Sequence, residues 1–175
     1  YNTTLGPIDL NGWTIRDNDI DSFTIDNGGP LILPANGFLA IGKSADPMLN
    51  GGLNVDYVFA DSLMALGNGE DELVLIAPDG IEVDRVTWDN GATFPDPNGA
   101  SMSLILTNLD NNDGANWCVA QTPYGDGDLG TPGTTNDCEP PASYDLQITE
   151  IWMGQDGTDL TADWIEITNY GDQSW

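Results

Sequence analysis

Hydrophobic residues along most of the chain occur in short runs that alternate with polar residues. Alternation with a period of two is typical of β-strands that bury one face. No stretch repeats hydrophobic residues with a helical period over three turns, and only SADPMLNGG, residues 44–52, is compatible with a short helical turn. Strands are therefore predicted within seven runs: GWTIRD, SFTID, GFLAIG, DYVFA, DELVLIA, EVDRVTW and SMSLILT.

Turn signals separate these runs at close intervals. Asn-Gly dipeptides are the strongest short hairpin signal, because both residues tolerate a positive φ. They begin at seven positions: Asn11, Asn27, Asn36, Asn50, Asn68, Asn90 and Asn98. Many short strands between such turns predict an all-β sandwich or barrel.

The pattern changes after residue 137, where the first domain, residues 1–137, is predicted to end. CEPPASYD, residues 138–145, is predicted to be a linker stiffened by its two prolines. In the segment 146–175, LQITEIW and WIEITN predict two strands separated by an acidic loop. Alternation places Leu146, Ile148 and Glu150 on one face of the first strand and Ile151 on the other. Two strands alone are marginal in water, so this pair is predicted to need a partner sheet.

The chain is strongly acidic, with 29 acidic and 3 basic residues and a net charge of −26. Binding to nucleic acid or to anionic lipid requires basic clusters, so neither is expected as a partner. No apolar run has the roughly 20 residues needed to span a bilayer, and no membrane insertion is expected. Most of the acidic residues are Asp, which favours turns. A solvated acidic surface suited to a salty medium accounts for most of this charge.

A minority of the acidic residues is predicted to bind Ca²⁺, the only cofactor expected. Calcium prefers several oxygen ligands from carboxylates and amides on flexible loops. No segment matches the complete EF-hand loop, and each single cluster is by itself more simply an acidic turn. On a strand, Asp17, Asp19 and Asp21 would share one face. The other candidates are Asp110, Asn112 and Asp113; Asp126 and Asp128; and Asp156, Asp159 and Asp163.

The residue types that are present also limit the chemistry. The chain has no histidine, which removes Ser-His-Asp triads and His-ligated metals. Nothing marks a catalytic pair of carboxylates, so no enzymatic activity is predicted. Cys118 and Cys138 bracket a loop rich in Gly, Pro and Asp, where a disulfide would restrict the unfolded chain. A disulfide is favoured over two buried free thiols, and it would indicate an extracellular or cell-surface location.

Several segments together resemble the lamin tail domain, an immunoglobulin-like β-sandwich found in nuclear lamins and in secreted bacterial proteins. They are IDLNGWTIRD, FTI, LILPANGFLAIG, LMALGNGEDELVLIAPDG and VDRVTW. NWCVAQTPYGDGDLGTPGTTN is similar to the closing segment of secreted bacterial members, so the resemblance covers residues 1–136. It implies an immunoglobulin-like sandwich in the first domain and a non-catalytic role.

The resemblance also implies an opening strand pair with an EWIE-like motif before the IDLNGW segment. A similar pair occurs instead at residues 148–169, where Trp164, Glu166 and Asn169 hold the motif positions. In this comparison Tyr1-Asn2 corresponds to Thr168-Asn169. Three explanations are open. The chain is a window from a tandem array, the pair folds back onto its own first domain, or the pair is donated to a neighbouring subunit.

The function predicted from these features is a structural or adhesive module of an extracellular filament or tandem array. Other copies of the chain would be its partners, joined head to tail by strand donation and stabilised by calcium. The residues predicted to carry the donation are Ile148, Ile151, Trp164, Ile165 and Ile167. The alternatives are an accessory domain of a larger secreted hydrolase or nuclease, and a window from a large multidomain surface protein.

Overall fold

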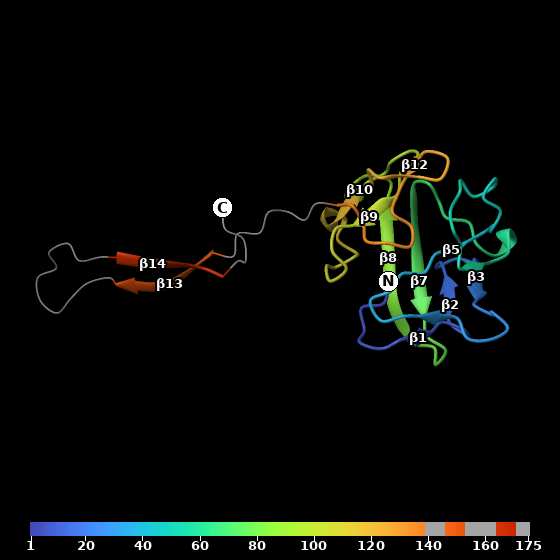
Figure 1. Ribbon diagram of the computed structural model, residues 1–175, viewed down its shortest axis with the longest axis horizontal. Coiled ribbons are helices and arrows are strands. Elements are labelled where there is room, and N and C mark those ends of the chain that lie inside the picture. Colours follow the sequence, from blue (N-terminus) through green and yellow to red (C-terminus); the bar gives the residue numbers. More distant parts are fainter. Residues whose placement is uncertain (139–145, 153–163, 171–175) are drawn as a thin grey trace, which may run out of the picture. The chain divides into compact units, whose positions relative to one another are not determined.

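The computed structural model describes residues 1–138, 146–152 and 164–170 (Figure 1). The chain divides into two compact units, Tyr1–Glu139 and Pro140–Trp175, and each is described by itself. Regular structure is almost entirely β. The helical elements of the described residues are two single turns of 3₁₀ helix, η1 (Asp61–Leu63) and η2 (Gly114–Asn116). The predicted all-β fold class is therefore confirmed.

The main sheet of the first unit has four strands in the order β3-β2-β7-β8. They are β2 (Thr14–Arg16), β3 (Ser22–Thr24), β7 (Glu70–Ile76) and β8 (Glu82–Asp89). All neighbours are antiparallel. β7 and β8 are the two long green strands of Figure 1. Their turn is closed by the N–H of Ala77, which donates to the carbonyl of Ile81, and Gly80 supplies the positive φ of 86°.

Short strand pairs form the rest of the first unit. β1 (Ile8–Asp9) pairs with β4 (Ile32–Leu33) in antiparallel orientation, and β5 (Ile41–Gly42) pairs with β6 (Tyr57–Val58) in parallel. β9 (Met102–Leu104) pairs with β10 (Trp117–Val119). β11 (Pro123–Tyr124) pairs with β12 (Asp128–Leu129).

The core lies between the main sheet and the short strands. Its buried cluster consists of Leu10, Phe23, Ile25, Leu33 and Met64. Partly buried residues pack against this cluster from both sides, among them Ile15 and Leu73 of the main sheet and Ile8, Ile41 and Tyr57 of the short strands. The rings of Phe23 and Phe59 stack with centroids 4.5 Å apart. Two layers around one core make a sandwich.

Each of the seven predicted strand runs contains a strand, and the segment 44–52 turns as its sequence allowed, without forming a helix. The segment forms hydrogen-bonded turns in which the N–H groups of Leu49 and Asn50 both donate to the carbonyl of Asp46. Gly51 and Gly52 then take positive φ values of 70° and 83°. Left-handed residues end any helical continuation, so the segment reverses direction.

The second unit contains β13 (Leu146–Trp152) and β14 (Trp164–Asn169), which pair in antiparallel orientation. We call these two strands the C-terminal strand pair. Ile148 lies opposite Ile167, whereas Glu150 lies opposite Glu166, so the register shifts between Ile148 and Glu150. Thr149 is therefore the extra residue of a β-bulge.

Candidate interaction site

Because of the bulge at Thr149, the aliphatic residues of the C-terminal strand pair lie on one face. Residues directly opposite in a ladder share a face, and alternate residues of a strand return to it. Without the bulge, Ile151 would lie on the opposite face from Ile148, as simple alternation predicted. With it, one face carries Leu146, Ile148, Ile151, Ile165 and Ile167.

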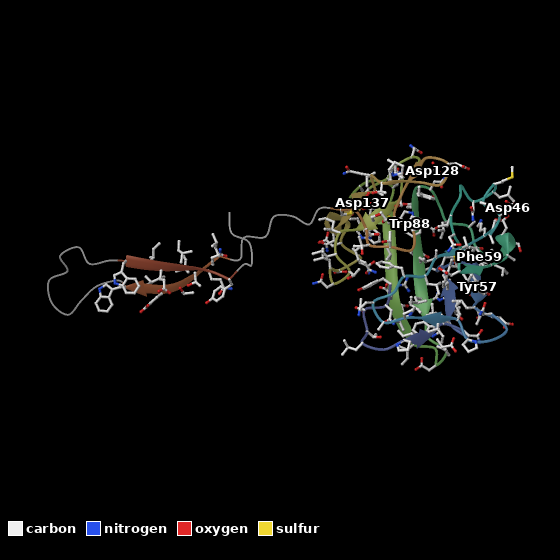
Figure 2. All side chains as sticks on the ribbon, in the orientation of Figure 1. Asp46, Tyr57, Phe59, Trp88, Asp128 and Asp137 are labelled. Carbon is white, nitrogen blue, oxygen red and sulfur yellow. A yellow bond between two sulfur atoms is a disulfide. The ribbon has the colours of Figure 1, made fainter. Side chains whose placement is uncertain are left out.

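This apolar face is open to solvent. Its five aliphatic side chains are between 53% and 61% exposed. Figure 2 draws side chains projecting from both faces of the pair. Burying one such side chain completely stabilises a protein by about 1.5–3 kcal/mol, so the face favours a covering partner.

The opposite face of the pair is polar. It carries Gln147, Glu150 and Glu166, together with hydroxyls of Thr149 and Thr168 that lie 2.9 Å apart. Thr149 also donates a hydrogen bond to the carboxylate of Glu166. Trp152 and Trp164 lie opposite each other at one end and are each more than two fifths exposed. The pair is thus amphipathic, and its polar face carries the two tryptophans at one end.

The segment that leads into β5 is hydrogen-bonded to the β6 side of the first unit. The carbonyl of Ala40 accepts from the N–H groups of Asp56 and Tyr57, and the carbonyl of Gly42 accepts from Phe59. The N–H of Ala40 donates to the carboxylate of Asp56, 2.8 Å away. Backbone groups of successive strand residues point to opposite sides. Those of Ile41 therefore point away from β6.

The beginning of the chain lies beside the residues that precede this segment. The N–H of Asn2 donates to the carbonyl of Gly37, and the N–H of Asn36 donates to the carbonyl of Asn2, both at 3.0 Å. The rings of Tyr1 and Phe38 are 4.7 Å apart. Asn2 thus pairs with Asn36 and Gly37, and the ring of Tyr1 lies against that of Phe38.

Asn2 anchors this segment through its side chain, which is 2% exposed. Its amide donates to the carbonyls of Gly6, Leu33 and Pro34 at 2.8, 3.2 and 3.1 Å. Its oxygen accepts from the N–H and the hydroxyl of Thr4. One buried side chain therefore holds both the first turn and the strand end at Leu33.

A groove lies beside Tyr1 and Asn2, with a volume of about 450 Å³. It is lined by apolar side chains from both layers of the sandwich, including Ile8, Leu10, Leu33, Leu75, Val83 and Leu104. Val83 is more than half exposed. The groove therefore opens part of the core region to solvent beside the first residues of the chain.

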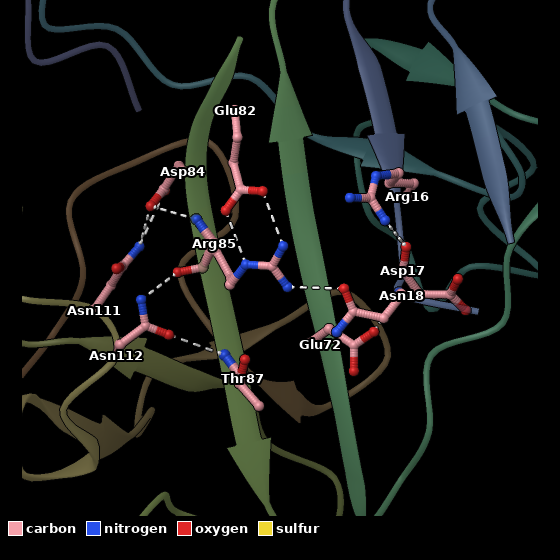
Figure 3. A network of polar contacts seen from close by, with 10 residues as sticks. All are labelled: Arg16, Asp17, Asn18, Glu72, Glu82, Asp84, Arg85, Thr87, Asn111 and Asn112. Carbon is pink, nitrogen blue, oxygen red and sulfur yellow. Dashed lines mark hydrogen bonds and ion pairs between the residues drawn. The ribbon is translucent and has the colours of Figure 1, made fainter. Parts of the chain in front are cut away.

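The outer edge of β8 is occupied at its centre by the side chain of Asn112 (Figure 3). The amide of Asn112 donates to the carbonyl of Arg85 at 2.7 Å, and its oxygen accepts from the N–H of Thr87 at 3.2 Å. This arrangement copies the hydrogen bonds of a neighbouring strand. Asn111 supports it by donating to both oxygens of Asp84, at 2.9 and 3.0 Å.

The side chain of Arg85 makes further hydrogen bonds in the same region. Its guanidinium donates two hydrogen bonds to the Glu82 carboxylate, at 2.8 and 2.9 Å, and one to the side-chain oxygen of Asn18 at 3.0 Å. Hydrogen bonding from Arg85 lowers the pKa of Glu82. Because the pair with Glu82 is bidentate and charge-assisted, it holds the guanidinium in one orientation.

Several of the acidic residues predicted to bind calcium accept hydrogen bonds from backbone N–H groups of the first unit. Asp17, Asp19 and Asp21 lie in the loop between β2 and β3, so the prediction of a shared strand face is wrong. The Asp17 carboxylate accepts from the N–H groups of Asp19 and Asp21 at 2.8 and 3.1 Å. Because Asp17 caps its own loop, the chain turns here instead of continuing as a strand. The carboxylate of Asp21 accepts from the N–H of Ala65.

The remaining predicted calcium residues are spread over separate loops. Asp110 caps the turn at Asn112, and Asp113 caps η2 by accepting from the N–H of Ala115. The N–H of Asp126 donates to the carbonyl of Gly51, and Asp128 begins β12 (Figure 2). Asp156, Asp159 and Asp163 lie outside the described residues. The calcium prediction therefore stays a prediction.

One group of ligand-type residues comes together in the described part of the chain: Cys118, Asp137 and Cys138, with ligand atoms within 4.8 Å. The two sulfurs form a disulfide, with Cα atoms 6.0 Å apart, as predicted. Disulfide sulfurs are not thiolates, so this group is not a metal site. The Asp137 carboxylate accepts from the N–H groups of Gln121 and Thr122 at 2.7 and 2.6 Å. These bonds lower the pKa of Asp137.

Comparison with known proteins agrees with the geometry. Within the described residues, no helix has the length and apolar character required to cross a bilayer. No curated protein and no solved structure matches the chain. The family model described as Lamin Tail Domain matches residues 1–90, more than half of the chain and all of the main sheet. This protein therefore belongs to the lamin tail domain family, with its immunoglobulin-like all-β fold.

Proposed function

We propose that the chain is a non-catalytic structural module that joins other copies head to tail through its C-terminal strand pair. The observation that carries the proposal is the exposed apolar face of that pair, with its five aliphatic side chains. The family to which the chain belongs is an immunoglobulin-like structural family. A strand pair with one apolar face gains stability from a sheet that it can extend and a core that it can cover.

Donation of the pair to a neighbour leads to an extended assembly. A head-to-tail contact uses two different surfaces, and it produces a filament when the rotation between copies does not close. The disulfide between Cys118 and Cys138 supports an oxidising, extracellular setting. We therefore place the module in an extracellular filament or a tandem array of such modules.

Charge sets the conditions under which copies can associate. Each copy carries a net charge of −26, so neighbouring copies repel one another at low ionic strength. The Debye length falls to about 3 Å at 1 M salt. Assembly is therefore expected to strengthen as salt is added, which is opposite to the behaviour of an assembly held by ion pairs.

The first prediction tests the apolar face. Replacing Ile167 by lysine places a charge within that face, while replacing Gln147 by lysine puts the same side chain on the polar face of the same pair. I167K is expected to weaken self-association at least about tenfold, because each 1.4 kcal/mol corresponds to a factor of ten. Q147K should leave association unchanged or strengthen it slightly by reducing the negative charge.

Sedimentation velocity at increasing protein concentration and high salt measures these effects. A wild-type chain that stays monomeric at every concentration would contradict the proposal. Equal association of the two lysine variants would show that the apolar face does not make the contact.

The second prediction concerns calcium, which we retain as a proposed stabiliser bound by at least one acidic turn. A ligand that binds only the folded state stabilises it by about 2.7 kcal/mol at one hundred times its dissociation constant. EDTA is therefore expected to lower the melting temperature of calcium-loaded protein by several degrees, and excess calcium should restore it. Differential scanning calorimetry at constant ionic strength measures this shift. An unchanged melting temperature would assign the acidic residues to surface charge and turn capping alone.

A further inference from the structure

The Asn-Gly dipeptides that form turns between the strands are also places where the chain can react with itself. The backbone nitrogen of the glycine loses its proton to solvent and attacks Cγ of the asparagine side chain. An N–Cγ bond forms and the Cγ–Nδ2 bond breaks, so that Nδ2 leaves as ammonia and a cyclic succinimide remains. Glycine favours this step because it has no side chain and allows the backbone rotation that brings the two atoms together.

Water then opens the succinimide. Hydrolysis at Cγ releases the glycine nitrogen from the side chain and gives aspartate, whereas hydrolysis at the backbone carbonyl leaves that nitrogen on Cγ and gives isoaspartate. In both cases asparagine and water become a carboxylic acid and ammonia, without an oxidant or a reductant. The new acid is ionised at neutral pH, so each reaction makes the chain more negative. Isoaspartate also adds a methylene group to the backbone.

The turns at Asn11, Asn27 and Asn36 restrain both reacting groups. At Asn11 the side-chain oxygen accepts from the N–H of Asn27 at 2.9 Å, and the N–H of Gly12 donates to the carbonyl of Ile25 at 2.8 Å. The same double restraint holds at Asn27 and Asn36, where the side chain and the N–H of the following glycine are each hydrogen-bonded. Reaction at these turns therefore requires that hydrogen bonds break first.

Asn50 is restrained through its side chain. Its amide donates to the carbonyls of Ser44 and Leu53, both at 2.9 Å, and its oxygen accepts from the N–H of Gly52 at 3.1 Å. These hydrogen bonds hold the carboxamide in place, so Cγ cannot turn toward the glycine nitrogen without breaking them.

Asn90 is restrained by a closed turn. Asn90 and Gly91 have φ values of 56° and 76°, and the N–H of Ala92 donates to the carbonyl of Asp89 at 3.3 Å. Positive φ at both central residues is typical of a type I′ turn. The Asn90 side chain also lies against Gly69, where an added Cβ would be 2.9 Å from its oxygen. The rotation that the reaction needs would open this turn.

Asn68 and Asn98 lack these restraints. Both residues are exposed. Within the described part of the chain, neither their side chains nor the N–H groups of Gly69 and Gly99 form a hydrogen bond. At these two positions the glycine nitrogen and Cγ can therefore meet without a hydrogen bond of either group being broken.

We propose that the folded chain is modified at Asn98 and, more slowly, at Asn68, where asparagine converts to aspartate and isoaspartate, while the other Asn-Gly turns stay intact. Asn68 is the slower site because the N–H of Gly67 donates to the carboxylate of Asp71, which closes its loop. Among the described residues no hydrogen bond closes the loop around Asn98 in this way. The reaction involves no second copy, so it does not depend on the proposed function.

The product at Asn98 would alter the contact between its loop and β12. The carbonyl of Gly99 accepts from the N–H of Leu129 at 2.9 Å. The Asp128 carboxylate lies near Gly99, where an added Cβ would be 3.6 Å from Oδ1. Isoaspartate lengthens the backbone beside this carbonyl, and the new charge lies close to that of Asp128. The modified loop is therefore expected to hold β12 less firmly.

Peptide mapping of the full chain tests the assignment. The folded protein is incubated at mildly alkaline pH, which speeds loss of the backbone proton, and is sampled over several weeks. Chymotryptic peptides are analysed by mass spectrometry, in which electron-transfer fragmentation distinguishes isoaspartate from aspartate. Asn98 and then Asn68 are expected to react at least about tenfold faster than Asn11, Asn36 and Asn50, because about 1.4 kcal/mol in the barrier corresponds to a factor of ten.

Two controls separate the effect of the fold from that of the sequence. In urea with reductant the hydrogen bonds are absent while every dipeptide is still Asn-Gly, so the rates at all seven sites should become similar. N98Q should remove the fast reaction and leave the slower one at Asn68 unchanged. Equal rates at all sites in the folded chain, or a faster reaction at Asn50 than at Asn98, would overturn the proposal. The same order of rates in urea would overturn it as well, because neighbouring residues and not the fold would then set the rates.

Discussion

Replacing Asn2 by leucine is expected to lower the free energy of unfolding by about 3 kcal/mol, because buried carbonyls that lose their donor cost about 1–3 kcal/mol each. The Asn2 amide donates to three carbonyls, of Gly6, Leu33 and Pro34, from a nearly fully buried position. Leucine has the same branched arrangement of side-chain heavy atoms, so the effect reports mainly the lost hydrogen bonds.

Urea denaturation monitored by tryptophan fluorescence measures this difference. The matched control is N27L, because the Asn27 amide donates to the carbonyl of Pro30 from an exposed position, and water can replace that bond. N27L should change the free energy of unfolding by less than about 0.5 kcal/mol, as is usual for surface substitutions. A loss below 1 kcal/mol in N2L would mean that water reaches these carbonyls.

Removing the disulfide by replacing Cys118 and Cys138 with serine is the second large perturbation. A disulfide that closes a loop of this size stabilises the folded state over the unfolded state by about 3 kcal/mol. The bond joins β10 to the end of the first unit across a separation of 20 residues. The double variant should therefore unfold at a clearly lower urea concentration than the wild type.

Reductant provides the internal control for this prediction. Dithiothreitol should destabilise the wild type to a similar degree and leave the double serine variant unchanged. Thiol titration of the denatured wild type, purified without reductant, should find no free thiol. Two free thiols per chain would show that the bond is absent in solution.

The strands were predictable from the sequence because alternation and Asn-Gly turns act locally. Where a single residue breaks the local rule, prediction failed. Thr149 forms a bulge that moves Ile151 to the face of Ile148, and strict alternation cannot anticipate an inserted residue. Asp17 similarly looked like a member of an acidic strand, yet its carboxylate caps its own loop.

The C-terminal strand pair and the pairing of β5 differed in how far the sequence could identify them. Ile148, Ile165 and Ile167 indicated the donated pair, because apolar residues without a sheet are visible in the pattern. The neighbours of β5 were missed, since the alternation of GFLAIG predicts a strand but not its partners. Only the hydrogen bonds of Ala40 and Gly42 with the β6 segment show which strand lies beside it.

The side chain of Asn112 limits how β8 can pair with other copies at high local concentration. Linked modules meet at effective concentrations in about the millimolar range, where exposed edges of identical sheets tend to fuse. β8, with 8 residues, is the longest strand described in the first unit and would be the strongest template for such fusion. Asn112 already occupies its backbone at Arg85 and Thr87. Asn112 thereby leaves less of the β8 edge free to pair with a second sheet.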